Sequence, residues 1–409
     1  MTNSRLAVLA TLILSPCTAY GWTFKKTSGR DVDKDGGTHQ DSDGFSKLVA
    51  WMRRHGGRVD DRVVVSVADD GMRGGVAVLD IEQGAELLHC PWELVIGSTS
   101  YEVQLGNDMC AVVRDLETEL RLGESSLWHP YLSLDDSLIN SRLPTLWEEE
   151  IVAELQGLPP GQDATRHIRW FSQHCDDGRP FDQVDEITKQ ALLCFLTRAC
   201  EVGMLPVYDL FNHHNGLRNA KAQLAPEGVQ LIATRPIPKG SQIYLSYGIK
   251  TASTMFRDYG FVESWPQTWS WRSAGTGNSH TFVRFPDQAI ALYPTEELLK
   301  AIWKGGMSLI EFKDAATQHT QALTVEALHL FHTESQALLT GLATDAAEDK
   351  IILANLKDSL AQDGDGIVRL EDTISAVEYR IVFKEAVKEA MIESIRCLEK
   401  AAPPIGEEL

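Results

Sequence analysis

The sequence has few cysteines, and none of them has the spacing of a metal site. Seven cysteines occur among 409 residues, with no C-x-x-C pair. No cluster of histidines accompanies them, so a structural zinc site is not expected. Cys17 would leave with an N-terminal signal. The spacing of the other six neither demands nor excludes disulfides in an oxidising compartment.

Positive charge is also scarce. Lysine and arginine number 38 against 58 aspartates and glutamates, which gives a formal net charge of -20. Such a field repels phosphate backbones, so nucleic acid is not expected as a partner, whereas a basic protein segment would be attracted. A negative charge that only maintains solubility explains the composition equally well.

Long apolar runs are absent, and the most apolar stretch lies at the N-terminus. Arg5 precedes an apolar run over residues 6–14, and small residues follow at cleavage spacing. This pattern predicts a secretory signal over residues 1–21, with a buried first helix as the alternative, and no membrane span in the mature chain. Residues 22–44 are predicted to be a polar linker unlike a simple transit peptide. The predicted destination is the secretory pathway or a plastid reached through it.

The remaining chain has ordinary globular composition, 43% hydrophobic and 23% charged, and a length that suggests two or three folding units. Glycine-rich turns separate short apolar runs in its first half, which predicts strands, and the 3.6-residue period predicts helices around and after them. The expected strands are 63–67, 76–79 and 86–89, and the expected helices are 45–55, 109–122, 146–157, 186–200, 296–303, 324–342, 347–362 and 370–401. Together these segments predict an α+β chain with two domains.

Polar residues lie inside the apolar pattern at three places. An apolar run from residue 205 closes on Asn212-His213, an aromatic-rich strand holds Tyr247-Gly248, and Tyr259 belongs to a second Tyr-Gly turn. Burying such groups costs free energy unless they are hydrogen-bonded, so each needs a structural partner or a ligand. Singly, each of these residues is explained as well by packing in a core. A glycine-rich segment at residues 71–75 would let backbone approach a ligand, or form a plain hairpin turn.

Taken together and in this order, these residues resemble a SET domain. They are similar to the class that includes the Rubisco large-subunit lysine methyltransferase and the actin-histidine methyltransferase. Residues 128–132 and 147–157 fit the same class, and residues 378–386 resemble part of its substrate-binding domain. The resemblance covers roughly residues 45–400.

The resemblance implies a β-rich, knot-like SET domain at residues 45–274 with a helical insert at about 100–190. An all-α substrate-binding domain would follow at residues 275–409. The implied cofactor is S-adenosyl-L-methionine, and its contacts are assigned by match of position. Backbone would come from Met72, Arg73 and Gly74, a carboxylate partner from Arg198, and contacts to the amino end and adenine from Asn212 and His213. Tyr247, at the methyl-transfer channel and the cofactor, and Tyr259, lining that channel, are the expected catalytic residues.

The implied activity is methyl transfer to a side-chain nitrogen of a protein substrate, with lysine as the expected target. The sulfonium methyl is already electrophilic, so no metal is expected. Cys200 stands where the lysine-methylating relatives have an aromatic residue and the actin-histidine enzyme an asparagine, and Ala252 replaces the usual asparagine after Tyr247. Residues 212–217 look more like the histidine-methylating branch, so histidine stays the alternative target. An inactive SET-like module that binds protein through the helical tail is the third interpretation.

Overall fold

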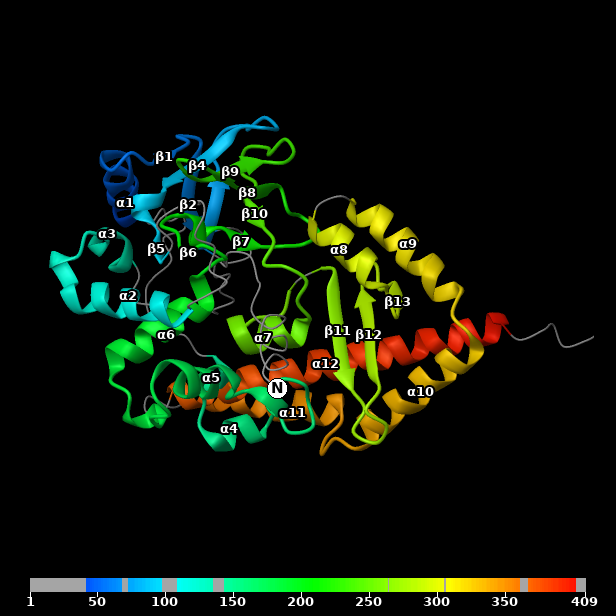
Figure 1. Cartoon of the computed structure of the whole chain (residues 1–409). Coiled ribbons are helices and arrows are strands. Elements are labelled where there is room, and N and C mark those ends of the chain that lie inside the picture. The colour runs from blue at the N-terminus through cyan, green and yellow to red at the C-terminus, as the bar shows by residue number, and fades with distance from the viewer. Residues whose placement is uncertain are drawn as a thin grey trace, which may run out of the picture. The chain divides into compact units, whose positions relative to one another are not determined.

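The structure is a computed structural model that describes residues 42–67, 73–97, 109–134, 143–263, 265–304, 307–360 and 367–401 (Figure 1). The chain forms two compact units. The first contains Met1–Ser141 and His167–Gly248, and the second contains Arg142–Arg166 and Ile249–Leu409. The predicted signal at residues 1–21 and nearly all of the predicted linker at residues 22–44 lie outside the described residues.

The first unit is built on a four-stranded antiparallel sheet in the order β1-β4-β9-β8, with three smaller strand pairs, β2-β3, β5-β6 and the parallel pair β7-β10. Its strands are β1 (Arg58–Val59), β2 (Val63–Val67), β3 (Arg73–Ala77), β4 (Glu86–Pro91), β5 (Ile96–Gly97), β6 (Gly203–Met204), β7 (Asn212–His213), β8 (Ala220–Ala225), β9 (Gly228–Ala233) and β10 (Tyr244–Leu245). Its helices are α1 (Ser42–Arg54), α2 (Met109–Leu122), α3 (His129–Leu132), α5 (Arg166–Cys175) and α6 (Glu186–Arg198), with 3-10 turns η1 (Trp92–Leu94), η2 (Gly123–Ser125), η6 (Phe181–Gln183) and η7 (Tyr208–Leu210).

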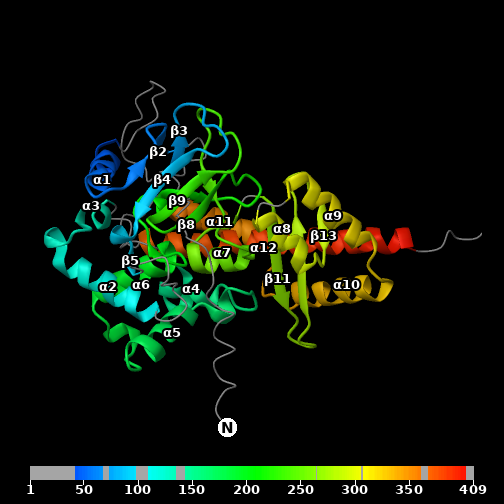
Figure 2. The same ribbon diagram turned by 45° about the horizontal axis from the view of Figure 1, so that its top comes forward.

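The core of the first unit lies on the central strands of this sheet. Five of the six residues of β4 are buried, whereas β8 at the sheet's edge is mostly exposed. Leu48 and Met52, four residues apart on one face of α1, are fully buried in the same apolar cluster as Leu88 of β4. α1 lies beside β2 in both views (Figures 1 and 2).

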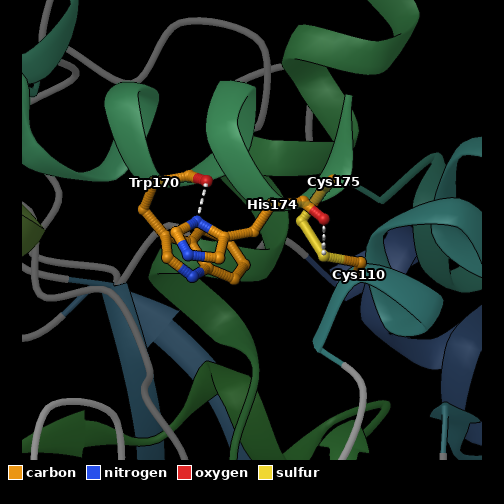
Figure 3. The surroundings of a disulfide bond; sticks show 4 residues. All are labelled: Cys110, Trp170, His174 and Cys175. Carbon is orange, nitrogen blue, oxygen red and sulfur yellow. Dashed lines mark hydrogen bonds between the residues drawn. A yellow bond between two sulfur atoms is a disulfide. The ribbon is translucent and has the colours of Figure 1, made fainter. Parts of the chain in front are cut away.

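A disulfide joins two helices of the first unit. Cys110 near the start of α2 is bonded to Cys175 at the end of α5, 65 residues further along the chain. Figure 3 shows the bond beside His174, whose ring stacks on the Trp170 indole and whose Nδ1 lies 2.9 Å from the Trp170 carbonyl oxygen. The sequence spacing had left the pairing of these cysteines open.

The second unit combines a three-stranded antiparallel sheet, β11-β12-β13, with helices. Its elements are η4 (Pro144–Leu146), α4 (Glu149–Ala153), η5 (Gly161–Asp163), α7 (Ala252–Tyr259), β11 (Gln267–Arg272), β12 (Ser279–Arg284), β13 (Ile290–Leu292), α8 (Glu296–Lys304), α9 (Leu309–Gln321), α10 (Val325–Thr340), α11 (Ala346–Leu360) and α12 (Ile367–Ala401). α10 and α11 pack along the long helix α12. Aromatic side chains fill the core between sheet and helices, with Trp269 and Phe383 both fully buried and their rings 5.8 Å apart.

A buried ion cluster ties α11 to α12. Asp349 is fully buried, accepts from Lys384 Nζ at 2.6 Å and pairs with the Arg380 guanidinium. The Thr344 hydroxyl donates to the same carboxylate at 2.7 Å. These donors lower the pKa of Asp349 below its ordinary value, against the opposing effect of burial.

Several predicted elements differ from the structure. The predicted helix 109–122 is confirmed as α2, and the C-terminal region is helical from Glu296 onward. The predicted domain boundary at residue 275 falls inside the turn of the β11–β12 hairpin, and β12 and β13 precede the helices, so residues 275–409 are not all-α. The expected strand 76–79 is instead β3, Arg73–Ala77, because its pairing with β2 begins at Arg73 and ends at Ala77.

No helix within the described residues is both long enough and apolar enough to cross a bilayer. The same residues contain no group of three or more histidine, cysteine, aspartate or glutamate side chains that could hold a metal ion.

Candidate functional site

The first unit brings Asn212 and His213 into a short buried strand. β7 pairs in parallel with β10, with Asn212 opposite Tyr244 and His213 opposite Leu245. Asn212 is fully buried and His213 is 5% exposed. The Asn212 amide nitrogen donates to Gln242 Oε1 at 3.0 Å, so part of its hydrogen-bonding capacity is met within the chain. Gln242, itself buried, is a member of this site that the sequence did not single out.

Gly74 of β3 lies directly against Asn212. A Cβ atom at Gly74 would stand 2.4 Å from Asn212 Nδ2 and 3.1 Å from Gln242 Oε1, and one at Gly75 would stand 2.3 Å from the Phe211 ring. Only glycine permits this approach. The predicted site residues Gly74 and Asn212 are therefore brought together. Arg73 begins β3, whereas Met72 lies outside the described residues.

His213 and Tyr247 are joined by a hydrogen bond and by ring packing. The Tyr247 backbone N–H donates to His213 Nδ1 at 2.8 Å, and the two ring centroids lie 4.6 Å apart. Because Nδ1 accepts this bond, the proton of the neutral imidazole is on Nε2. The fully buried Tyr247 hydroxyl donates to the Phe211 carbonyl oxygen at 3.3 Å. Its phenol oxygen is thereby held beside the chain that enters β7.

The turn after Tyr247 is fixed by polar side chains. Ser246 Oγ donates to Asn215 Oδ1 at 2.6 Å and accepts from the Gly248 backbone N–H at 3.2 Å. Gly248 has a φ of 100°. These bonds restrain the backbone on both sides of Tyr247, next to the N–H that binds His213.

Arg198 ends α6, which begins at an Asp185 N-cap that accepts from the backbone N–H groups of Ile187 and Thr188. The Arg198 side chain is 4% exposed, and its Nη1 donates to Asp209 Oδ2 at 3.1 Å. Asp209 belongs to η7, three residues before Asn212 in the chain. The structure thus connects Arg198 with the Asn212-His213 strand through one buried carboxylate.

Cys200 follows α6 in a tight turn. Its backbone N–H donates to the Gly203 carbonyl oxygen at 2.9 Å, and the Gly203 N–H donates back to the Cys200 carbonyl at 3.1 Å. Cys200 is 4% exposed. The expectation that this position faces the acceptor side chain stays a prediction.

Tyr259 belongs to the second unit, as the last residue of α7. It is 4% exposed, and Lys250 Nζ lies 5.3 Å from its ring centroid, within range of a cation–π contact. Burial lowers the pKa of Lys250 to about 8. Tyr247 lies in the first unit, so the expected pairing of the two tyrosines in one channel stays a prediction.

Comparison with protein-family models gave no match. Among curated proteins, the chain is 22% identical over 278 residues to the actin-histidine N-methyltransferase of Canis lupus familiaris, which covers 58% of this chain and 45% of that protein. It is 22% identical over 276 residues to the N-lysine methyltransferase SETD6 of Bos taurus, which covers 58% of this chain and 61% of that protein. The matches thus span between about half and three-fifths of these relatives.

Solved structures decide the fold. A structure of Rubisco LSMT bound to AdoMet superimposes with a TM-score of 0.53 and 18% identity, over 90% of this chain and 98% of that one. The SET domain of LSMT bound to lysine and AdoHcy superimposes with a TM-score of 0.52 and 18% identity, over 87% and 92%. The chain has a SET-domain fold. The resemblance indicated by the sequence motifs is confirmed at this level.

Within the SET fold, the sequence missed Asp209, Gln242 and Tyr131, whose hydroxyl donates to Asp209 at 2.8 Å. Asp209 is a polar residue between Tyr208 and Leu210, which is the signal that would have found it, whereas Gln242 follows Ser241 and gave no such signal. Tyr131 gave no such signal, because its partner lies 78 residues away in the chain. The strand β7 thus contains a buried amide, paired with Gln242, and an oriented histidine, and a buried arginine and a fixed phenol contact the chain next to it. Such a set suits binding of an amino-acid carboxylate and exclusion of water, with no covalent nucleophile required.

Proposed function

We propose that the chain is a protein methyltransferase that uses S-adenosyl-L-methionine (AdoMet) and acts on a lysine side chain. The observation that carries the proposal is the contact of Arg198 and Tyr247 with one short buried segment, residues 209–213, inside a SET fold. Solved structures with this fold are described as bound to AdoMet, to lysine and to monomethyllysine. Relatives named as lysine and histidine methyltransferases add independent support.

The residues present fit this cofactor. A buried guanidinium suits a carboxylate, because a charge-assisted, forked pair is strong where water is excluded. Arg198 would hold the carboxylate of the cofactor's methionine part. The cofactor's polar edges would meet Asn212 and His213. Because Gly74 has no Cβ, its own backbone lies close to the same strand.

The cofactor, when bound, supplies an electrophilic sulfonium methyl. The chain's own residues orient the acceptor and keep water out. The fully buried Tyr247 has its hydroxyl on the Phe211 carbonyl and its N–H on His213, so its phenol oxygen can direct a lysine amine without reorganising. The acceptor amine would lose its proton more easily beside the positive sulfonium and the Tyr247 ring, because a nearby like charge disfavours the ammonium form. Replacing Tyr247 with phenylalanine is expected to lower kcat and to shift the pH–rate profile, and an unchanged profile would count against this role.

Whether the methyl acceptor is lysine or histidine can be decided by a labelling experiment. Lysine is proposed because solved structures of the same fold are described with lysine and monomethyllysine bound. A lysate incubated with enzyme and isotopically labelled AdoMet, followed by mass spectrometry of the labelled peptides, would name both the substrate and the residue. Label on histidine would replace lysine with the alternative target, in line with the actin-histidine relatives. Failure of the protein to bind AdoMet would leave only the inactive binding module.

We further propose that the substrate presents its target within a basic segment. The chain carries a net charge of -20, and a field of that sign favours encounter with a basic partner. Peptides with one target lysine flanked by arginines or by glutamates test this. The arginine-flanked peptide is expected to have the lower KM, with the difference shrinking as salt is raised.

The compartment is proposed to be oxidising, reached through an N-terminal secretory signal and leading to the secretory pathway or a plastid. The Cys110–Cys175 disulfide supports this, because such bonds persist mainly outside the reducing cytosol (Figure 3). Expression in eukaryotic cells followed by non-reducing peptide mapping tests it. The protein is expressed with residues 1–21 included. Recovery of the Cys110 and Cys175 peptides only as free thiols would then contradict the proposal.

A further inference from the structure

Residues 128–132 carry part of the family resemblance, and the structure shows what their tyrosine contacts. Trp128 is the N-cap of α3, and the following four residues form the helix. The Trp128 indole N–H donates to the Leu94 carbonyl oxygen at 2.9 Å, and its backbone N–H donates to Ser126 Oγ at 3.0 Å. These bonds fix the short helix against the unit, and Tyr131 within it is 2% exposed.

Tyr131 and Arg198 meet on one carboxylate oxygen. The Tyr131 hydroxyl donates to Asp209 Oδ2 at 2.8 Å, and Arg198 Nη1 donates to the same atom at 3.1 Å. The Asp209 side chain is fully buried and that of Arg198 is 4% exposed. Burial, together with the negative charge of Asp209, raises the pKa of the Tyr131 phenol well above its ordinary value, so the tyrosine remains a donor. Two side chains, one of them 78 residues away in the chain, thus converge on one buried charge.

The backbone leading to Asp209 adopts a conformation that is unfavourable for its residue type. Val207, just before η7, has a φ of 70° and a ψ of -38°. A β-branched residue rarely occupies this region, and holding it there is unfavourable. Val207 is fully buried, so the surrounding packing enforces the turn. The turn places the Asp209 carboxylate within reach of both donors.

We propose that Tyr131 and Asp209 are positioning residues that hold the Arg198 guanidinium in the orientation required to bind the carboxylate of the cofactor's amino-acid part. This inference rests on the proposed function. It assigns a task to the tyrosine of residues 128–132 and to the aspartate of the apolar run before Asn212.

The physical reason is geometric. An arginine side chain has several rotatable bonds, and its planar fork binds a carboxylate well only in one plane. A fixed Asp209 oxygen sets the position of one Nη atom, and Tyr131 in turn prevents that carboxylate from rotating. Pre-orientation of this kind lowers the ordering cost of binding, and partners that orient a ligand-binding side chain commonly matter almost as much as the side chain itself.

The test uses two ligands that differ in the group Arg198 would bind. S-adenosylhomocysteine carries the amino-acid carboxylate, whereas 5′-methylthioadenosine keeps the adenosine and the sulfur but lacks it. The full-length wild type, Tyr131→Phe and Asp209→Asn are titrated with each ligand by calorimetry. Tyr379→Phe is the matched control, because it also removes a fully buried tyrosine hydroxyl bond, to Ser253 at 2.7 Å, but in the second unit.

We expect Asp209→Asn to weaken S-adenosylhomocysteine binding by about 10- to 100-fold, and Tyr131→Phe by about 3- to 10-fold. Methylthioadenosine affinity should stay within about 2-fold in both variants, and Tyr379→Phe should alter neither ligand. Equal weakening of both ligands would overturn the inference by showing a merely structural role. Unchanged or tighter S-adenosylhomocysteine binding in Tyr131→Phe and Asp209→Asn would also overturn it. A wild type that binds neither ligand would instead refute the proposed function on which the inference rests.

Discussion

The disulfide between α2 and α5 gives a quantitative prediction for the stability of the first unit. Cys110 and Cys175 close a loop with a sequence separation of 65. Chain-entropy estimates for a cross-link of this length give about 4 kcal/mol of stabilisation, through the conformational freedom it removes from the unfolded chain. The Arg121 salt bridge with Asp185, the N-cap of α6, also links α2 to α6, but both side chains are largely exposed and the pair contributes little. The cross-link should therefore contribute more than this ion pair to the stability of the region around α2.

The perturbation is replacement of both cysteines, Cys110→Ser with Cys175→Ser, compared with each single replacement. Urea unfolding is followed by hydrogen exchange and mass spectrometry, so that peptides of the two units report separately. Each single variant removes the whole cross-link. Either one should therefore lower the unfolding free energy of the first unit by the same amount, about 4 kcal/mol, as the double variant.

Two outcomes would refute this reasoning. A double variant whose first unit stays within about 1 kcal/mol of the wild type would mean that the bond contributes little to folding. Losses that add, with the double variant losing twice as much as either single one, would assign the effect to packing of the individual sulfurs. Cys397→Ser, which replaces a buried free cysteine of the second unit, is the control and should leave peptides of the first unit unchanged.

Further predictions concern the charges of the second unit. Asp349→Ala leaves Arg380 and Lys384 as buried cations without their shared carboxylate, and unfolding by urea at pH 7 should show a loss of about 3–5 kcal/mol. Because the folded pKa of Asp349 lies below its ordinary 3.8, its contribution is complete above that value and lost as pH falls through the folded pKa, so an acid titration of stability should separate wild type from variant. The pKa of Lys250 is about 8 in the folded chain and 10.5 ordinarily. Between these two pH values the unfolded chain still carries the Lys250 proton, whereas the folded chain has released it. Wild-type stability relative to Lys250→Met should rise with pH across that window, and a flat difference would contradict the burial of the amine.

Local sequence patterns predicted the helices better than the site. α2 was predicted with its observed ends because its apolar period and the closing Gly123 are local signals. α9 was missed although it has a complete capping box, Ser308 with Glu311. β12 lies inside the all-α domain that the resemblance implied at residues 275–409, and the sequence pattern gave no strand there because the pairing of β12 with β11 and β13 is a tertiary contact that no local period reports.

The candidate site was predictable only in its outline. Asn212, His213, Tyr247 and Arg198 were indicated by their order and by the family resemblance. In the structure Tyr247 bonds His213, and Arg198 bonds Asp209, three residues before Asn212. The partners that fix them were not found. The Gln242 amide, 30 residues from Asn212, and the Tyr131 hydroxyl, 78 residues from Asp209, depend on how distant segments fold together. A polar residue in an apolar run shows that a partner must exist, but the fold decides which one.

The most direct measurement for the central claim is calorimetric titration of the full-length wild type and an Arg198→Ala variant with AdoMet. Arg121→Ala, which removes a partly exposed arginine that is also ion-paired in the first unit, is the control. We expect saturable binding to the wild type and to Arg121→Ala, and a loss of at least about 10-fold in affinity for Arg198→Ala. Absence of binding to the wild type, or equal affinity of the wild type and Arg198→Ala, would contradict the account.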